Sequence, residues 1–86
     1  MSYTVLLEHR AERELRELPQ ALLKSVDRRL RTLATNPRPP GATMLKGKEV
    51  EGWRLRVGDY RILYTIDDSA QLVRVYRIKH RREVYR

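Results

Sequence analysis

Arginines occupy regular positions in the stretch 53–64 of the sequence. Arg54 and Arg56 alternate with apolar residues, and Arg61 follows the short connection Gly58-Asp59. A period of two is typical of a β-strand, in which successive side chains point to opposite faces. We therefore expect the three arginines on one open sheet face, where they would stabilise the negative charge that a phosphodiester gains in a transition state. The alternative is that they only keep an exposed face soluble.

Residues 79–86 are interpreted as a basic tail. Arg81 and Tyr85 would reach the arginine face from this tail, and a phenol can stack on a base or move a proton. His80 lies among basic residues and is a candidate for substrate contact, because imidazole changes charge near neutral pH. His9 has no neighbour in sequence that would complete a site, and we interpret it as structural or solvated.

Several other kinds of active site lack their residues. The absence of Cys excludes disulfides, Cys-ligated zinc and thiol nucleophiles, and it fits a reducing compartment. The two histidines stand at opposite ends of the chain, so a histidine-pair ribonuclease site would have to bridge them. The acidic residues of the second half show no metal-ligand spacing, and there is no P-loop or dinucleotide fingerprint. We expect neither a metal nor a cofactor.

The net charge of +8 points to an anionic partner. Nineteen Lys and Arg oppose eleven Asp and Glu, and fifteen of the nineteen are Arg. Because Arg makes bidentate contacts with phosphates and stacks on bases, nucleic acid is the first partner class that we expect. An acidic protein is the second, and a merely well-solvated surface is the third interpretation.

Length and hydropathy define the organisation of the chain. Its 86 residues make one domain, 1–86, without an internal repeat. The apolar run at the start is too short for a signal peptide or a membrane span. We therefore expect a cytoplasmic protein that has no membrane partner.

The elements that must position the arginines follow from hydrophobic periodicity. Apolar residues recur every three or four positions in two segments and alternate in four others. The predicted elements are a strand over 2–7, helices over 8–19 and 20–35, and strands over 53–57, 60–66 and 72–78. A long irregular segment, 36–51, carries Lys46 and Lys48, and loops of this length are often functional.

The predicted fold class is α+β with the order β-α-α-β-β-β. The two helices form a hairpin on one face of a mainly antiparallel, four-stranded sheet. Trp53, Leu55 and Val57 face the helices, so Arg54 and Arg56 project from the opposite face. A bulge near Arg77 is expected as well, because the alternation of the last strand breaks there.

The whole chain resembles a known family. The residues Trp-Arg-Leu-Arg-Val-Gly-Asp-Tyr-Arg-Ile-Leu-Tyr at 53–64 and His-Arg-Arg-Glu-Val-Tyr-Arg at 80–86 are similar to the RelE branch of the RelE/ParE toxin superfamily. The opening strand, the Leu-rich helical hairpin that ends in Asn36-Pro37, and Leu45-Lys46-Gly47 match it too. This resemblance implies a RelE-like toxin of a type II toxin–antitoxin system.

An activity and partners follow from the resemblance. It implies a metal-independent mRNA endoribonuclease that enters the ribosomal A site, cleaves the codon there and inhibits translation. The ribose 2′-hydroxyl would attack the adjacent phosphate and leave a 2′,3′-cyclic phosphate and a free 5′-hydroxyl. The implied partners are the 30S A site with its mRNA and a cognate antitoxin with an acidic or amphipathic segment. Operator DNA would be bound only through the antitoxin complex.

The resemblance also assigns roles to residues. Arg61 and Arg81 would hold the scissile phosphate, and Tyr85 would stack on a base, orient the ribose or transfer a proton. Arg54 and Arg56 stand where relatives often have lysine, which is the supposed general base in some of them. Further RNA-binding candidates are Lys46, Lys48, His80 and Arg82.

The proton acceptor is not identified by these residues, because arginine deprotonates poorly, with a pKa above ~12. Either the base lies elsewhere or catalysis relies on electrostatics and on positioning by the ribosome. The candidates for a base elsewhere are Lys46, Lys48, Glu49, Glu51 and His80.

Two other functions remain open on the same fold. One is a ParE-like inhibitor of DNA gyrase that does not cleave RNA. The other is an inactive homologue that acts only as an antitoxin-bound corepressor, with which an all-arginine strand set is compatible. The retained arginine–tyrosine set favours the nuclease over the gyrase inhibitor.

Overall fold

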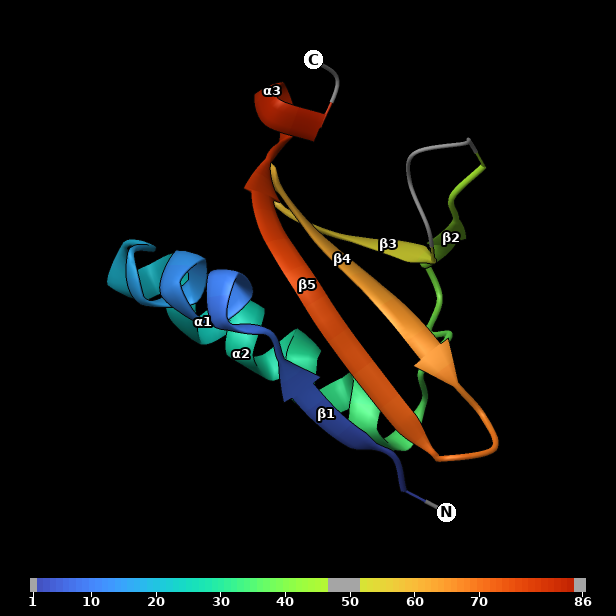
Figure 1. Cartoon of the computed structure of the whole chain (residues 1–86). Helices are drawn as coiled ribbons and strands as arrows, with labels where there is room; N and C mark the ends of the chain where they lie inside the picture. Colours follow the sequence, from blue (N-terminus) through green and yellow to red (C-terminus); the bar gives the residue numbers. More distant parts are fainter. Residues whose placement is uncertain (1, 47–51, 85–86) are drawn as a thin grey trace.

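The computed structural model describes residues 2–46 and 52–84, with the backbone alone for residues 83 and 84. In chain order its elements are β1 (Thr4–Leu7), α1 (His9–Arg16), α2 (Gln20–Thr35), β2 (Thr43–Met44), β3 (Trp53–Val57), β4 (Tyr60–Asp67), β5 (Leu72–His80) and α3 (Arg81–Val84). Figure 1 shows α1 and α2 together on one side of a twisted sheet. The predicted α+β class, with a helical hairpin on one sheet face, is confirmed.

The apolar stripe of α2 faces the sheet. Val26, Leu30 and Leu33 are buried, and their spacing of four and three residues places them on one side of the helix. α2 ends at Thr35, where Asn36 takes an extended backbone conformation before Pro37. No helix in the described ranges is long and apolar enough to cross a membrane.

α1 ends earlier than the sequence suggests. Its last helical residue is Arg16, whereas the periodicity extends to Leu18. The N–H of Leu18 donates to the Leu15 carbonyl at 3.2 Å, which tightens the last turn. Pro19, which has no N–H, then separates α1 from α2.

The sheet has five strands in the order β1-β5-β4-β3-β2, not four. β1 pairs with β5 in parallel, and the other neighbours are antiparallel. The helical hairpin carries the chain from β1 at one edge toward β2 at the other. β2 was not expected, because two residues are too few for alternation to be visible; Thr43 pairs with Arg54 and Met44 with Trp53.

The core lies between the helices and one face of the sheet. Leu55 and Val57 on β3 are buried there, and Trp53 packs against the same cluster, as predicted. Tyr64 is fully buried and donates its hydroxyl to the Pro37 carbonyl at 2.8 Å. Burial raises the pKa of the Tyr64 phenol to about 12, so this hydrogen bond persists across the neutral range.

The predicted bulge in β5 is confirmed. Leu63 pairs with Arg77 but Tyr64 pairs with Val75, so Tyr76 is the extra residue. Because of this insertion, Val75 and Ile78 both face the core although they are three residues apart. After the bulge, the alternation of core-facing and outward-facing residues in β5 is therefore shifted by one position.

One end of the sheet is fastened by a group that we call the paired cluster: Tyr3, Arg38 and Asp68. Arg38 donates to both carboxylate oxygens of Asp68, at 3.2 and 2.8 Å, and Tyr3 donates its hydroxyl at 2.6 Å. The hydrogen bonds from Arg38 and then from Tyr3 lower the pKa of Asp68 to about 2. The cluster ties β1 and the segment after α2 to the β4–β5 turn.

Candidate functional site

Three cations stand side by side across three neighbouring strands, at the end of the sheet far from the paired cluster. Arg61 on β4 is directly opposite Arg56 on β3 and directly opposite Lys79 on β5. Directly opposite residues share one sheet face, with Cβ atoms about 5 Å apart. We call Arg56, Arg61 and Lys79 the cation row; Arg54, two residues from Arg56, lies on the same face. The prediction that the three strand arginines share one face is thus confirmed.

Arg61, however, does not project into solvent as expected. It is only 4% exposed, and its guanidinium donates to the carbonyls of Gly58 at 3.2 Å and Tyr60 at 3.0 Å. Its Nε atom is buried without a hydrogen-bond partner in the part of the chain that the structure describes. It lies on the middle strand of the row, between cross-strand neighbours, and its guanidinium is held against the backbone of the β3–β4 turn.

Within the described residues, no carboxylate forms an ion pair with the row. Among residues 2–46 and 52–82, none of the ion pairs involves Arg54, Arg56, Arg61 or Lys79. Like charges directly opposite each other on a sheet are destabilising, by roughly the 0.2–1 kcal/mol that an opposite pair contributes. A set of neighbouring cations without an anion is suited to binding one.

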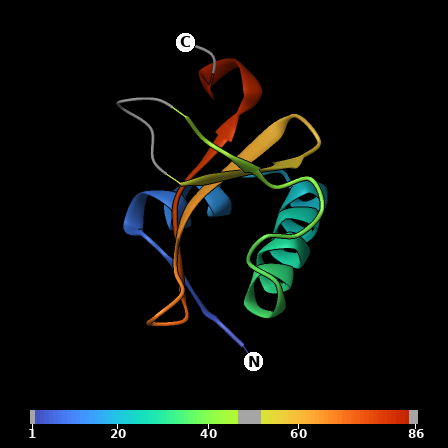
Figure 2. The same cartoon turned by 90° about the vertical axis from the view of Figure 1, so that its right-hand side faces the viewer.

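Arg81 and Arg82 begin α3, which packs against the ends of β4 and β5. Figure 2 shows α3 at the top, above β3 and the start of β4, and α2 at the right below these strands. The Arg81 N–H donates to the Asp59 carbonyl at 2.7 Å, and the Arg81 guanidinium lies 4.0 Å from the Asp59 carboxylate. These contacts tie the start of α3 to the β3–β4 turn, beside the row, while both arginine side chains stay exposed.

His80 lies on the other face of the sheet, so the structure does not bring it to the arginines. It pairs with Tyr60, and the two rings meet edge to face with centroids 5.3 Å apart. Its Nδ1 accepts the backbone N–H of Arg82 at 3.3 Å. β5 continues through His80 instead of ending at Ile78, so that Lys79 takes the position on the arginine face. A contact of His80 with RNA stays a prediction.

The remaining predicted residues are only partly placed. Lys46 is exposed just after β2 and has no described contact with the row. Lys48, Glu49, Glu51 and Tyr85 lie outside the described residues. Within the described ranges, no group of three or more His, Asp or Glu residues is placed to hold a metal ion.

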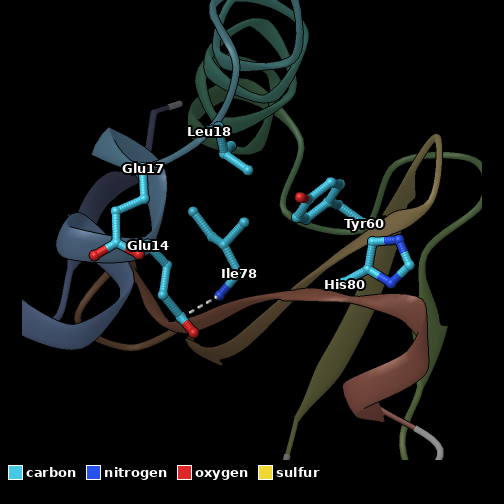
Figure 3. A pocket seen from close by; sticks show the side chains of 6 residues that line it. All are labelled: Glu14, Glu17, Leu18, Tyr60, Ile78 and His80. Atoms are coloured by element: carbon cyan, nitrogen blue, oxygen red, sulfur yellow. Dashed lines mark hydrogen bonds between the residues drawn. The ribbon is translucent and has the colours of Figure 1, made fainter.

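A small cavity of about 180 Å³ lies on the helix side of the sheet (Figure 3). Its lining residues are Glu14, Glu17, Leu18, Tyr60, Ile78 and His80. The Glu14 carboxylate accepts the backbone N–H of Ile78 at 2.9 Å and pairs with Arg77 at 2.8 Å. β1 ends opposite Val75, so Glu14 satisfies an N–H on the edge of β5 that β1 no longer reaches.

Two residues of this region were missed by the sequence interpretation. Glu14 interrupts the apolar stripe of α1, three residues after Ala11 and four before Leu18, and a carboxylate in that position signals a buried partner. Lys79 was placed in the tail. Only the two-residue extension of β5, together with the bulge, puts it opposite Arg61.

Comparisons with known proteins agree with this architecture. Residues 5–85 match the family described as the ParE toxin of the type II toxin–antitoxin system parDE. Toxin RelG of Mycobacterium tuberculosis is 35% identical over 88 residues, which cover 100% of this chain and 99% of that protein.

Solved structures of high similarity cover nearly the whole chain. The toxin–antitoxin complex RelBE2 of Mycobacterium tuberculosis contains a chain that is 33% identical, with a TM-score of 0.81 over 93% of this chain and 99% of that chain. The archaeal RelE–RelB complex of Pyrococcus horikoshii OT3 matches at 25% identity, with a TM-score of 0.82 over 94% and 97%. The sequence match, the five-stranded sheet and these neighbours agree: the chain belongs to the RelE/ParE family of type II toxin–antitoxin toxins.

Proposed function

We propose that this toxin is a metal-independent mRNA endoribonuclease that cleaves the codon in the ribosomal A site and thereby inhibits translation in the cytoplasm. The observation that carries this proposal is the cation row, in which Arg56, Arg61 and Lys79 face one another without an ion pair to any carboxylate of the described residues. A phosphodiester supplies the charge that the row lacks. Because neighbouring like charges destabilise a sheet, we expect the row to serve a function.

The proposed chemistry uses the RNA's own nucleophile. The ribose 2′-hydroxyl attacks the neighbouring phosphorus, the bond to the 5′-oxygen breaks, and a 2′,3′-cyclic phosphate remains. The phosphate oxygens gain negative charge in the transition state, where fixed positive charge in a water-poor site is most effective. The buried guanidinium of Arg61, whose Nε has no described partner, is suited to that position.

The surrounding residues take supporting roles in this proposal. Arg54 and Arg56 bind the RNA backbone beside the scissile phosphate, and Arg81 contacts it from the start of α3. Tyr85 stacks on a base or orients the ribose. Lys46, Lys48 and Arg82 add charge for the flanking nucleotides, since each phosphate contact releases counterions.

A protein partner is part of the proposal. The similar structures from Mycobacterium tuberculosis and Pyrococcus horikoshii are complexes with an antitoxin. We propose that a cognate antitoxin binds this chain through an acidic or amphipathic segment, because the chain carries a net charge of +8. Operator DNA is then contacted through the antitoxin complex.

A second candidate function, inhibition of DNA gyrase, is favoured by the description of the matching family as ParE toxin. This function needs a surface that binds gyrase and does not need a phosphate site. The two proposals therefore differ in whether the cation row must bind a phosphate.

Cleavage on programmed ribosomes separates the two candidates. Purified toxin is added to ribosomes with a defined A-site codon, and the mRNA ends are mapped by primer extension. Codon-phased cuts that are lost in Arg81→Ala and kept in the control Arg28→Ala, an exposed arginine on α2, support the nuclease. Intact mRNA together with trapped gyrase–DNA complexes would reject it.

A further inference from the structure

The proposed reaction needs an acceptor for the proton of the 2′-hydroxyl. Arg54, Arg56 and Arg61 cannot provide it, because a guanidinium holds its proton up to a pH above ~12. His80 is excluded by its position on the other face of the sheet. The acceptor must therefore be a different group that reaches the same phosphate.

We propose that the ε-amine of Lys79 takes this proton. The inference rests on the proposed nuclease function and names a further catalytic residue for it. Lys79 is directly opposite Arg61, and Lys24 and Lys46, the other described lysines, lie on α2 and after β2. Unlike a guanidinium, an amine can give up its proton and act as a base.

The geometry of the row places the amine beside the reacting bond. A phosphate bound at Arg61 on the middle strand has Arg56 on one side and Lys79 on the other. β1 ends opposite Val75, so β5 is the outermost strand at Lys79. Beyond Lys79 the face is therefore open at the sheet edge, and a ribose attached to that phosphate lies within reach of a half-buried lysine.

The proton balance is complete. Lys79 is a cation in the free protein and first gives one proton to water. The lone pair of the Lys79 Nζ atom then takes the proton of the 2′-hydroxyl as the 2′-oxygen bonds to phosphorus. The bond from phosphorus to the 5′-oxygen breaks, and this oxygen takes a proton from water. The hydroxide so formed removes the added proton from Lys79, which returns it to its proton-accepting form.

Asp59 is the competing base among the described residues near the row. It lies in the β3–β4 turn, and its carboxylate is 4.0 Å from the guanidinium of Arg81. A carboxylate in that position would repel the incoming phosphate unless Arg81 remains paired with it. Asp59→Asn is therefore the matched test of whether the base is the carboxylate or the amine.

The natural chain has no cysteine, which permits a test by chemical replacement. In Lys79→Cys the single thiol is alkylated with 2-bromoethylamine, which rebuilds an amine of nearly the same length. A parallel sample is alkylated with (2-bromoethyl)trimethylammonium, which restores the charge without a group that can accept a proton. Lys79→Arg is the genetic counterpart of the second sample, and thermal unfolding checks that each protein is folded.

We expect Lys79→Arg, Lys79→Cys and the trimethylammonium form to cut A-site codons at least ~100-fold more slowly than the natural toxin. The aminoethylated form should recover to within about tenfold of the natural rate, and Asp59→Asn should keep cutting.

Natural rates in Lys79→Arg or in the trimethylammonium form would overturn the proposal, since charge alone would then suffice. Loss of cutting in Asp59→Asn, with Lys79→Arg active, would move the base to Asp59. If the natural toxin leaves mRNA intact, the nuclease proposal itself fails.

Discussion

The two ends of β4 differ in how their positively charged residues are paired. Beyond its last residue, Arg38 donates two hydrogen bonds to Asp68, which also accepts one from Tyr3. Near its start, Arg61 stands between Arg56 and Lys79, and none of the ion pairs among the described residues involves any of the three. One strand thus connects a cluster whose charges are matched with a row whose charges are not.

The protein has fifteen arginines, and this difference separates one with a structural partner from those that we propose to bind RNA. The paired cluster joins three segments that are distant in sequence, and its charges are satisfied without a ligand. The cation row costs stability in the free protein, and bound phosphate would remove that cost. Composition alone cannot distinguish the two, because arginine occurs in both.

The largest effect is expected from converting the row into a paired arrangement. Arg56→Glu places a carboxylate directly opposite Arg61, so cleavage should fall by at least ~100-fold while stability rises by up to about 1 kcal/mol. Arg54→Glu is the control for stability, because its direct cross-strand partners, Leu63 and Thr43, are uncharged. Cleavage assays and urea denaturation of both variants measure the two effects. Arg56→Glu that is less stable than the natural protein would argue against repulsion in the row.

The framework of the paired end is tested by two glycines. Gly52 and Gly41 have φ values of +94° and +93°, but only at Gly52 would a Cβ overlap the carbonyl oxygen of Tyr64. Gly41→Ala should cost about 1 kcal/mol for its backbone conformation, and Gly52→Ala a further ~1–3 kcal/mol for the overlap. Equal losses in urea denaturation would show that β3 can shift away from Tyr64.

A paired arginine also lies only two residues from the row. Arg77 and Glu14 are 16% and 19% exposed, and Glu14 also accepts the N–H of Ile78. Removing the negative charge in Glu14→Gln should lower the free energy of unfolding by about 2 kcal/mol, since it removes the carboxylate that pairs with a poorly solvated arginine. Glu17→Gln, at the exposed residue that directly follows α1, should change it by less than about 0.5 kcal/mol. Similar values for the two variants would mean that the Arg77 pair is not stabilising.

The paired cluster should make the stability of the fold depend on pH in the acid range. The pKa of Asp68 is about 2 in the folded protein, below its ordinary value of 3.8, because Arg38 and Tyr3 donate hydrogen bonds to the carboxylate. Its contribution to stability is therefore complete above about pH 4 and is lost as the pH falls through about 2. The difference in melting temperature between the natural protein and Asp68→Asn should shrink over this range. A constant difference would contradict the assigned hydrogen bonds.

The sequence was informative where one physical rule acts alone. Alternation is sufficient to place Arg54, Arg56 and Arg61 on one face, and the broken alternation around Arg77 is sufficient to predict the bulge. Both follow from the period of a strand, which local sequence determines.

The sequence was uninformative where position depends on a neighbouring strand. The burial of Arg61 results from flanking strands, and the opposite faces of Lys79 and His80 result from the length of β5. β2 is only two residues long, so pairing with β3 rather than its own pattern defines it. The role of Glu14 depends on where β1 ends, which the sequence of α1 does not contain.

The most direct test of the account compares one arginine from each end of β4. Arg61→Met and Arg38→Met are assayed in parallel for single-turnover cleavage of an A-site codon and for thermal stability. We predict that Arg61→Met loses at least ~100-fold in cleavage and keeps or gains stability, because a buried, unbalanced charge has been replaced by an apolar side chain. Arg38→Met should lose stability and cut at the natural rate. Natural cleavage by Arg61→Met would contradict the central claim that the cation row acts on the phosphate.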